Sequence, residues 1–367
     1  MTNFVFTLGL ILITGPLHLD IDQAVSIALS KNLTLKQSKV QATSSKVSFY
    51  ESLTGYLPQP SIQISYSNTK ASIPLSQPGL PPIYTYTNKG YQVYLSLDQS
   101  LFDPDRLLSI WEQRNQKRYS YYELSEKERD IVLQVKSAYF NALKTRRIIE
   151  ERKKALERAR ENLDFVQMRY NLGSASRIDL LNAKVEKGQA ELNLEKAKAD
   201  KEMADRTLLN LLGIEERVPL ELEEVSIPEP EPEIPPFDSL LEIALRERPL
   251  MKGARTSLSS AKANFWYSTL TFLPRVSFGW YSSYGSEEKF PNSFRELWDN
   301  STRSSGIYLS INFNFTSYPF YVINSRYNWK SQELSYKLTR LEVIKDIEDA
   351  YRNLKTAMDA LKQARLI

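Results

Sequence analysis

The strongest constraint on the fold of this chain is an internal duplication. Residues 22–66 align with residues 238–282 without a gap, at a constant offset of 216 positions. Shared helix composition does not explain the match, because a Leu-Pro pair closes both segments at the same place. Each half of the chain therefore repeats one structural plan. The residues of the first copy that recur 216 positions later are Asp22, Ile27, Ala28, Leu29, Lys36, Ser44, Lys46, Phe49, Ser52, Leu57, Pro58 and Ser61.

Each copy is predicted to begin with an amphipathic helix of about 35 residues, ended by Pro58 in the first copy and by Pro274 in the second. Apolar and polar residues then alternate, which is typical of strands with one apolar and one wettable face. A Pro-rich loop at 71–88 and a polar loop at about 285–305 separate the paired strands. The sequence therefore predicts two β-hairpins, over 61–99 and 275–316.

Four such strands allow a soluble sandwich with one buried face, but aromatic residues crowd the predicted strand ends. Membrane barrels place girdles of aromatic residues at the two interfaces. About eight strands are needed to close even a filled barrel, so a chain with four strands must supply them to an oligomer. The aromatic residues in question are Tyr84, Tyr86, Tyr91, Trp280, Tyr281, Tyr284, Tyr318, Phe320 and Tyr321.

A very long helical hairpin is predicted over 106–212. The first helix covers about 65 residues, roughly 95 Å at 1.5 Å per residue, which outgrows an ordinary globular core. Apolar residues recur every seven positions, as in a coiled coil. The return helix, 177–212, carries alanines at the same spacing, which allows close helix approach. The recurring residues are Val135, Ala142, Ile149, Leu156, Leu163 and Tyr170, then Ala183, Ala190, Ala197, Ala204 and Leu211.

Local chemistry accounts for the turn of this hairpin. Gly173 suits the left-handed residue that ends a helix, and Ser176 with Asp179 fits a capping box for the outgoing helix. Gly213 closes the return helix, and the Pro/Glu-rich segment 214–236 is predicted to be a solvated linker into the second copy.

Composition excludes several classes of function. Lys and Arg total 48 against 44 Asp and Glu, so no nucleic-acid partner is expected. There is no Cys and only one His, His18, so no disulfide, thiolate metal site or Cys nucleophile is available.

Residues 4–13 form an apolar stretch, and residues 1–18 are interpreted as a signal peptide or leader. No apolar run elsewhere approaches the roughly 18 residues of a membrane helix, so strands would have to make any bilayer crossing.

The segment from Arg169 to Ala183, with its Tyr-Asn-Leu-Gly-Ser-Ala-Ser-Arg-Ile-Asp-Leu-Leu core, resembles the hairpin element of the TolC-type outer-membrane efflux family. The paired Ile-Ala-Leu helices that end in Leu-Pro before a strand resemble the two repeats of that family. The resemblance covers nearly the whole chain from Leu19 onward. It implies a homotrimer in outer-membrane lipid, in which each protomer gives four antiparallel strands to a twelve-stranded barrel and long coiled-coil helices form a periplasmic tunnel.

The resemblance also implies functional residues and partners. In that family the hairpin tips contact the periplasmic adaptor of an inner-membrane pump. The alternative is that the tip residues only form a turn. Only the docking role predicts that a charge at Ser174 impairs export without unfolding the protein. The tip residues are Arg169, Leu172, Gly173, Ser174, Ser176 and Asp179. The polar residues expected to face the barrel lumen, from alternation, are Gln63, Gln92, Asp98, Asn312 and Asn314.

The domain organisation predicted from these features has a first repeat at 19–213 and a second at 237–367. The second long helix is expected to begin near Ser325, and the sequence stops at Ile367, before a second hairpin. A fragment of a channel is therefore one alternative.

The favoured function is a passive outer-membrane conduit of a tripartite efflux or type I secretion system, with no catalytic, cofactor or metal site. An enzyme is disfavoured because the sequence has no Gly-rich phosphate loop, no His-Glu-x-x-His and no Gly-x-Ser-x-Gly. A soluble periplasmic coiled-coil adaptor remains the stronger rival. The transported solute cannot be inferred from the sequence.

Overall fold

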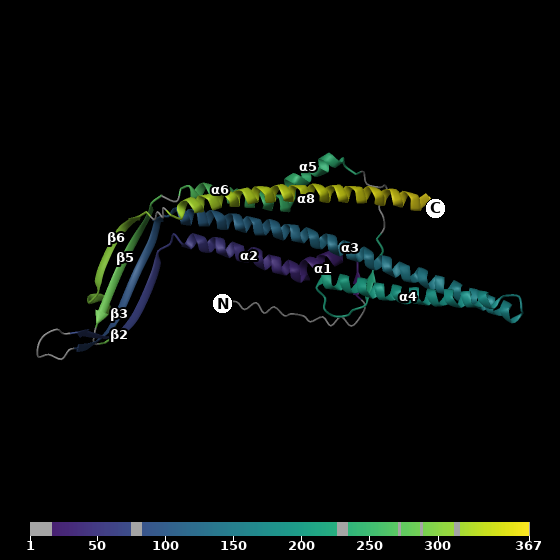
Figure 1. Ribbon diagram of the computed structural model, residues 1–367, viewed down its shortest axis with the longest axis horizontal. Helices are drawn as coiled ribbons and strands as arrows, with labels where there is room; N and C mark the ends of the chain where they lie inside the picture. Colours follow the sequence, from purple (N-terminus) through teal and green to yellow (C-terminus); the bar gives the residue numbers. More distant parts are fainter. Residues whose placement is uncertain are drawn as a thin grey trace. The chain divides into compact units, whose positions relative to one another are not determined.

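The computed structural model describes residues 17–74, 83–225, 234–270, 273–286, 289–311 and 316–366. The chain divides into two compact units, one of residues 1–41 and 122–242 and one of residues 42–121 and 243–367. The apolar stretch of the predicted leader, together with Asn312 and Asn314, lies outside the described residues. The helices and strands are labelled in Figure 1.

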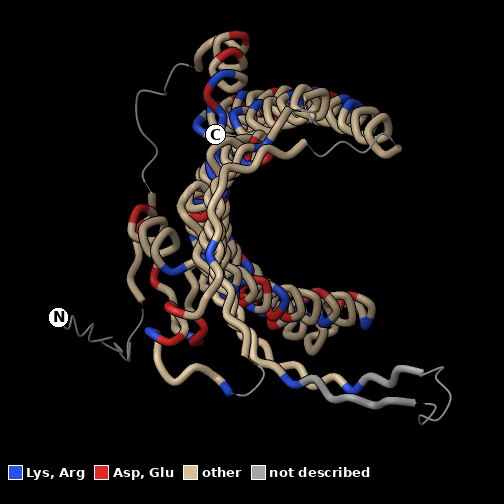
Figure 2. Tube along the Cα trace, turned by 90° about the vertical axis from the view of Figure 1, so that its left-hand side faces the viewer, with Lys and Arg blue, Asp and Glu red and all other residues tan. Residues whose placement is uncertain are grey.

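The helical hairpin consists of α3, Pro104–Asn171, and α4, Arg177–Leu212. α3 is 68 residues long and α4 is 36, so the predicted long helices are confirmed. Within the first unit, Ile131, Val135 and Ala142 of α3 share one hydrophobic cluster with Ala204 and Leu208 of α4. The seven-residue stripe is therefore the buried seam of an antiparallel coiled coil. Charged residues of both signs are interspersed along the helices (Figure 2).

A small two-stranded sheet in the first unit was not predicted. β1, Leu17–Leu19, pairs in parallel with β4, Leu220–Leu222, which lies inside the segment expected to be a solvated linker. His18, expected within the leader, is therefore part of a strand, and its Nδ1 lies 3.1 Å from a carboxylate oxygen of Glu221. The three-residue strands are too short to show a periodicity in the sequence.

Tyr139 of α3 holds this small sheet against the hairpin. Its side chain is fully buried, and its hydroxyl donates toward the carbonyl oxygens of Leu19, at 2.9 Å, and Glu223, at 2.8 Å. Burial is the main cause that raises the pKa of the Tyr139 phenol above its usual value. The phenol therefore stays protonated and keeps donating at neutral pH.

The opening helix of each copy is broken in two, which corrects the prediction of one continuous helix. The first copy has α1, Ile21–Lys31, and α2, Leu33–Thr54. Asn32 makes the break: its Nδ2 donates to the carbonyl of Leu211 at 2.8 Å, and its Oδ1 accepts from the amide of Leu35 at 3.0 Å. One asparagine thus ties the helix break to the end of α4 and caps the next helix.

The opening helix of the second copy is interrupted at the matching place, and the cause there is a proline. It has α5, Phe237–Glu247, and α6, Pro249–Ser268. Pro249 is the first residue of α6, where its missing N–H costs nothing, and it holds Arg248 out of the helical conformation. In both copies the helix ends before the Leu-Pro pair, at Thr54 and at Ser268, rather than at the proline.

The second unit contains a four-stranded antiparallel sheet in the order β2-β3-β5-β6. Because β3 and β5 are neighbours, the two copies of the repeat meet inside this sheet. The segment predicted as a polar loop between the last two strands contains a short helix, α7. The bounds are β2 Gln59–Pro74, β3 Ile83–Phe102, β5 Arg275–Ser286, α7 Phe294–Asp299 and β6 Thr302–Ser310.

The long helix of the second copy, α8, spans Tyr318–Leu366 and begins earlier than Ser325. Pro319 falls in its first turn, where proline is tolerated, so the aromatic run that resembled a strand end is helical. α8 packs on α6 around Met251 and Val343, both fully buried. No described helix combines the length and the apolar character needed to cross a bilayer.

Replacing Tyr139 with Phe should lower the free energy of unfolding by about 1–3 kcal/mol, because the hydroxyl that the Leu19 and Glu223 carbonyls share as a donor is lost while the ring is kept. The Leu19 carbonyl still accepts from the amide of Glu223, so the loss falls mainly on the Glu223 carbonyl. Denaturant unfolding followed by circular dichroism measures the change. Tyr121→Phe, at an exposed position on the same helix, is the matched control and should be nearly neutral. Equal stability of the two variants would contradict a structural role for the Tyr139 hydroxyl.

Candidate functional site

The register of the four strands separates polar and apolar side chains onto opposite faces. Gln59 lies opposite Asp98, and Ser65 lies opposite Gln92. Residues that face each other across antiparallel strands point to the same side, so Gln63, two positions from Ser65, shares that side. The three described residues of the predicted polar set, Gln63, Gln92 and Asp98, therefore lie on one face. The polar face continues onto β5 and β6 with Gly279, Tyr281, Ser283, Thr302, Ser304 and Gly306.

Asp98 organises the polar face. One carboxylate oxygen accepts from the Tyr281 hydroxyl at 2.7 Å, and the other accepts from the Ser96 hydroxyl at 3.1 Å. The hydroxyls of Ser96 and Ser61 are 2.8 Å apart. These bonds link β2, β3 and β5 through side chains, so the polar face has its own hydrogen-bonded order.

The opposite face is apolar, and it is exposed along the two outer strands, β2 and β6. Ile62 and Ile307 are each 72% exposed. A contiguous apolar surface of this kind marks a site of contact with protein or membrane. The side chains of this face are Ile62, Ile64, Tyr66, Val93, Leu95, Leu97, Phe278, Trp280, Tyr284, Ile307 and Leu309.

α7 covers one part of the apolar face. Leu297 packs on Val93 and Tyr284, and Trp298 stacks on Trp280 with 6.0 Å between ring centroids. The guanidinium of Arg303, a charge on the apolar face, lies 4.4 Å from the Trp298 ring centroid. The signal for this helix was in the sequence, because the hydroxyl of Ser293 accepts from the amide of Glu296, three residues on, as in a capping box.

The sheet has two open edges. Among the described strands, β2 pairs only with β3, and β6 pairs only with β5. Each edge therefore presents backbone N–H and C=O groups that no described strand satisfies. Exposed edges of this length favour pairing with a strand of another chain.

The hairpin tip is built as the sequence predicted. Gly173 has φ of +75°, the left-handed conformation that closes α3. The Ser176 hydroxyl accepts from the Asp179 amide, and the Asp179 carboxylate accepts from the Ser176 amide at 2.9 Å, which completes the capping box. A guanidinium nitrogen of Arg169 donates to the carbonyl of Ser174 at 3.0 Å. The six predicted tip residues therefore lie in the turn and in the helix ends that flank it, with Arg169 in α3 and Asp179 in α4, and Leu172 is 77% exposed.

Hydrogen bonds from Ser176 hold the pKa of the Asp179 carboxyl below its usual value. A carboxyl with a lowered pKa contributes stability above its ordinary pKa, and that contribution is lost as the pH falls through the folded value. The cap is therefore intact at neutral pH and weakens only in acid.

Where helices and sheet of the second unit meet, a charged cluster fixes their connection. Arg275, the first residue of β5, pairs with Asp105, and its Nε lies 3.5 Å from the Asp103 carboxylate. Arg106 donates to the carbonyl of Gly55, and the Tyr267 hydroxyl donates to Asp105. Burial raises the pKa of Tyr267 to about 12, so this donor persists at neutral pH.

The described residues contain no cluster of three or more His, Cys, Asp or Glu side chains placed to hold a metal ion. The carboxylates of Asp98 in the sheet and of Asp179 in the tip each accept hydrogen bonds from neighbouring groups.

Residues 25–214 match the family described as outer membrane efflux protein, which is more than half of the chain. The chain belongs to this family. The outer membrane efflux proteins are transport channels rather than enzymes, and their place is the outer membrane, extending into the periplasm.

A curated relative is the alkaline protease secretion protein AprF of Pseudomonas aeruginosa, which is 25% identical over 227 residues. The match covers 60% of this chain and 46% of the relative, so the chain spans about half the length of the curated relative it matches.

Solved structures share the fold of this outer membrane efflux protein. A membrane protein from Pseudomonas aeruginosa superposes with a TM-score of 0.73 at 19% identity, covering 94% of this chain and 76% of that one. The outer-membrane channel OprN gives 0.71 at 17% identity, covering 94% and 77%. VceC of Vibrio cholerae, an outer membrane protein, gives 0.71 at 14% identity, covering 94% and 82%. The predicted class, long helices with a few antiparallel strands as in TolC-type channels, is confirmed.

Gly173→Ala should lower the free energy of unfolding by about 1–2 kcal/mol, because alanine resists the left-handed conformation. An added Cβ would meet no atom within 4 Å, so strain in the backbone is the whole cause. Thermal unfolding followed by circular dichroism measures the effect.

The matched control is Gly188→Ala in the middle of α4, where a Cβ also meets nothing within 4 Å. This variant should gain about 0.5–1 kcal/mol, because alanine is the better helix former. Destabilisation by both substitutions, or by neither, would contradict the assigned role of Gly173.

Proposed function

We propose that this chain is the outer-membrane channel component of a tripartite efflux or type I secretion system and acts as a passive conduit without covalent chemistry. One observation carries the proposal: a single four-stranded sheet has an exposed apolar face, a hydrogen-bonded polar face and two open edges. Such a sheet matches lipid on one side and water on the other.

The open edges support assembly with further copies. Four strands are too few to close a barrel, since about eight are needed even for a filled one. Three copies in a ring would join β2 of one copy to β6 of the next and give twelve strands. The polar set of Gln63, Gln92 and Asp98 would then line the lumen, with Asn312 and Asn314 added from outside the described residues.

The hairpin tip is the proposed docking point for a periplasmic adaptor, which would connect the channel to an inner-membrane pump. Its support is a rigid turn that displays apolar side chains: Leu172, Met168 and Ile178 are all exposed. The relative AprF is an alkaline protease secretion protein, which favours a secretion or efflux role here.

Expression of this chain in a Gram-negative cell, followed by membrane fractionation and mild detergent extraction, tests the proposal. We expect a heat-labile trimer in the outer-membrane fraction that resists a carbonate wash. A soluble monomer, or a protein removed by carbonate, would contradict the channel and favour an adaptor-like protein.

Ser174→Glu should reduce co-purification with the adaptor and export by about tenfold or more. The free energy of unfolding should fall by no more than about 1 kcal/mol, because only the exposed hydrogen bond from the Ser174 hydroxyl to the carbonyl of Arg169 is lost. The added charge sits on the displayed surface of the turn. Gln189→Glu adds the same charge at an exposed position on α4 and should leave both properties unchanged. Equal export by the two variants would show that the tip is not part of the docking surface.

A further inference from the structure

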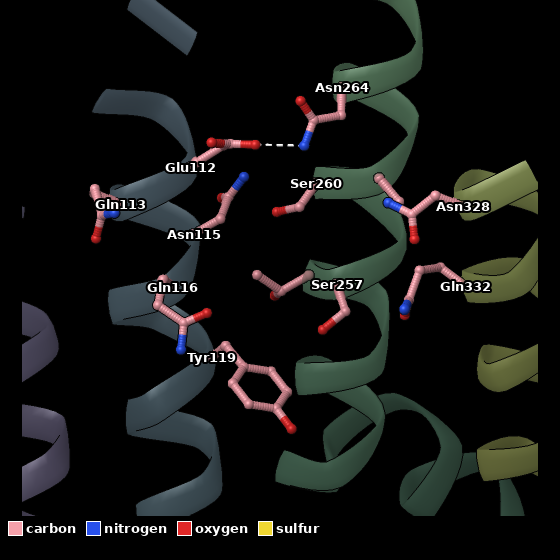
Figure 3. A pocket seen from close by; sticks show the side chains of 12 residues that line it. Glu112, Gln113, Asn115, Gln116, Tyr119, Ser257, Ser260, Asn264, Asn328 and Gln332 are labelled. Carbon is pink, nitrogen blue, oxygen red and sulfur yellow. Dashed lines mark hydrogen bonds between the residues drawn. The ribbon is translucent and has the colours of Figure 1, made fainter. Parts of the chain in front are cut away.

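The second unit contains a polar cavity between α3, α6 and α8 (Figure 3). Its volume is about 380 Å³, and all its lining residues belong to that unit. Six of the lining side chains are carboxamides: Gln113, Asn115, Gln116, Asn264, Asn328 and Gln332. The conduit function described above makes no use of this concentration of carboxamides.

Asn115 gives the cavity an unsatisfied donor. Its side chain is 6% exposed, yet its Nδ2 has no hydrogen-bond partner among the described residues. In Figure 3 it extends from α3 toward α6, between Glu112 and Ser260. A buried amide without a partner is destabilising, so a bound acceptor would recover free energy at this point.

The charge of the cavity restricts what it can bind. No Lys, Arg or His lines it, so an anionic ligand would find no cation. The only carboxylate, on Glu112, already accepts a hydrogen bond from Asn264. A phosphate or carboxylate ligand would be repelled by Glu112, and a single carboxylate is too few for a divalent cation.

The remaining chemistry matches hydroxyl groups. A carboxamide offers both donors and an acceptor, and a sugar hydroxyl is at once a donor and an acceptor. Tyr119 adds a ring at the end of the cavity (Figure 3). Cavities of about 300–1,000 Å³ hold small molecules, and apolar lining is the rule for drug-like ligands, so this lining favours a polar one.

We propose that this cavity binds a neutral polyhydroxylated ligand of about monosaccharide size, with Asn115 as the central donor. The ligand is either a free sugar or the terminal unit of a glycan, and both present the same ring hydroxyls. The proposal concerns a site in the helical wall and does not depend on the adaptor or on the solute of the conduit.

Saturation-transfer NMR and isothermal titration of the whole chain in detergent test the proposal, with glucose, galactose, mannose and myo-inositol as probes. We expect saturable binding of at least one probe at millimolar concentration or better, and at least about tenfold weaker binding of glucose 6-phosphate than of glucose. A methyl glycoside that binds as well as its free sugar identifies the glycan terminus as the source, and binding of the free sugar alone identifies the free form.

Asn115→Leu should weaken binding of the probe by at least about tenfold without loss of thermal stability, because it removes a donor that has no partner in the protein. Asn353→Leu, at an exposed position on α8, is the matched control and should bind normally. Ser260→Leu fills the cavity from α6 and should also abolish binding, so the test does not depend on one variant. The absence of saturable binding for all four probes, or undiminished binding by both cavity variants, would overturn the proposal.

Discussion

The pairing of β3 with β5 is the constraint on which the two-faced sheet depends. Leu97 lies opposite Trp280, and Asp98 lies opposite Gly279, so one copy of the repeat sets the register of the other. A slip of one residue would move every side chain to the other face. The bond from Tyr281 to Asp98 holds the register from the polar side, and α7 covers the apolar side around Val93. The separation of polar from apolar side chains thus follows from one strand pairing.

The helices of the first unit are held together by close packing and by a few buried hydrogen bonds. Small alanines let α3 and α4 approach closely over a length that no globular core requires, and Tyr139 and Asn32 anchor short elements to this hairpin by buried hydrogen bonds. The hairpin ends in the exposed turn at Gly173.

Periodicity made the long hairpin, its caps and the two faces of the sheet predictable, because Gly173, Ser176 and the alternating strands act through local chemistry. The helix break at Asn32 was not predictable, since its cause is a bond to Leu211 that is distant in sequence. β1 and β4 are too short to carry a pattern, and α8 begins with an aromatic run that fits a strand equally well. The cavity around Asn115 requires three helices from both copies, so only the fold reveals it.

The chain has no Cys, so a single introduced thiol reports on one position. The most direct test compares Ile62→Cys with Gln63→Cys, which are neighbours in sequence but lie on opposite faces of β2. In intact outer membranes we expect a water-soluble maleimide to label Gln63→Cys. Ile62→Cys should be protected by lipid and react only after the membrane is dissolved and the protein unfolded. Equal labelling of both positions in intact membranes would contradict the assignment of one face to lipid and the other to a water-filled lumen.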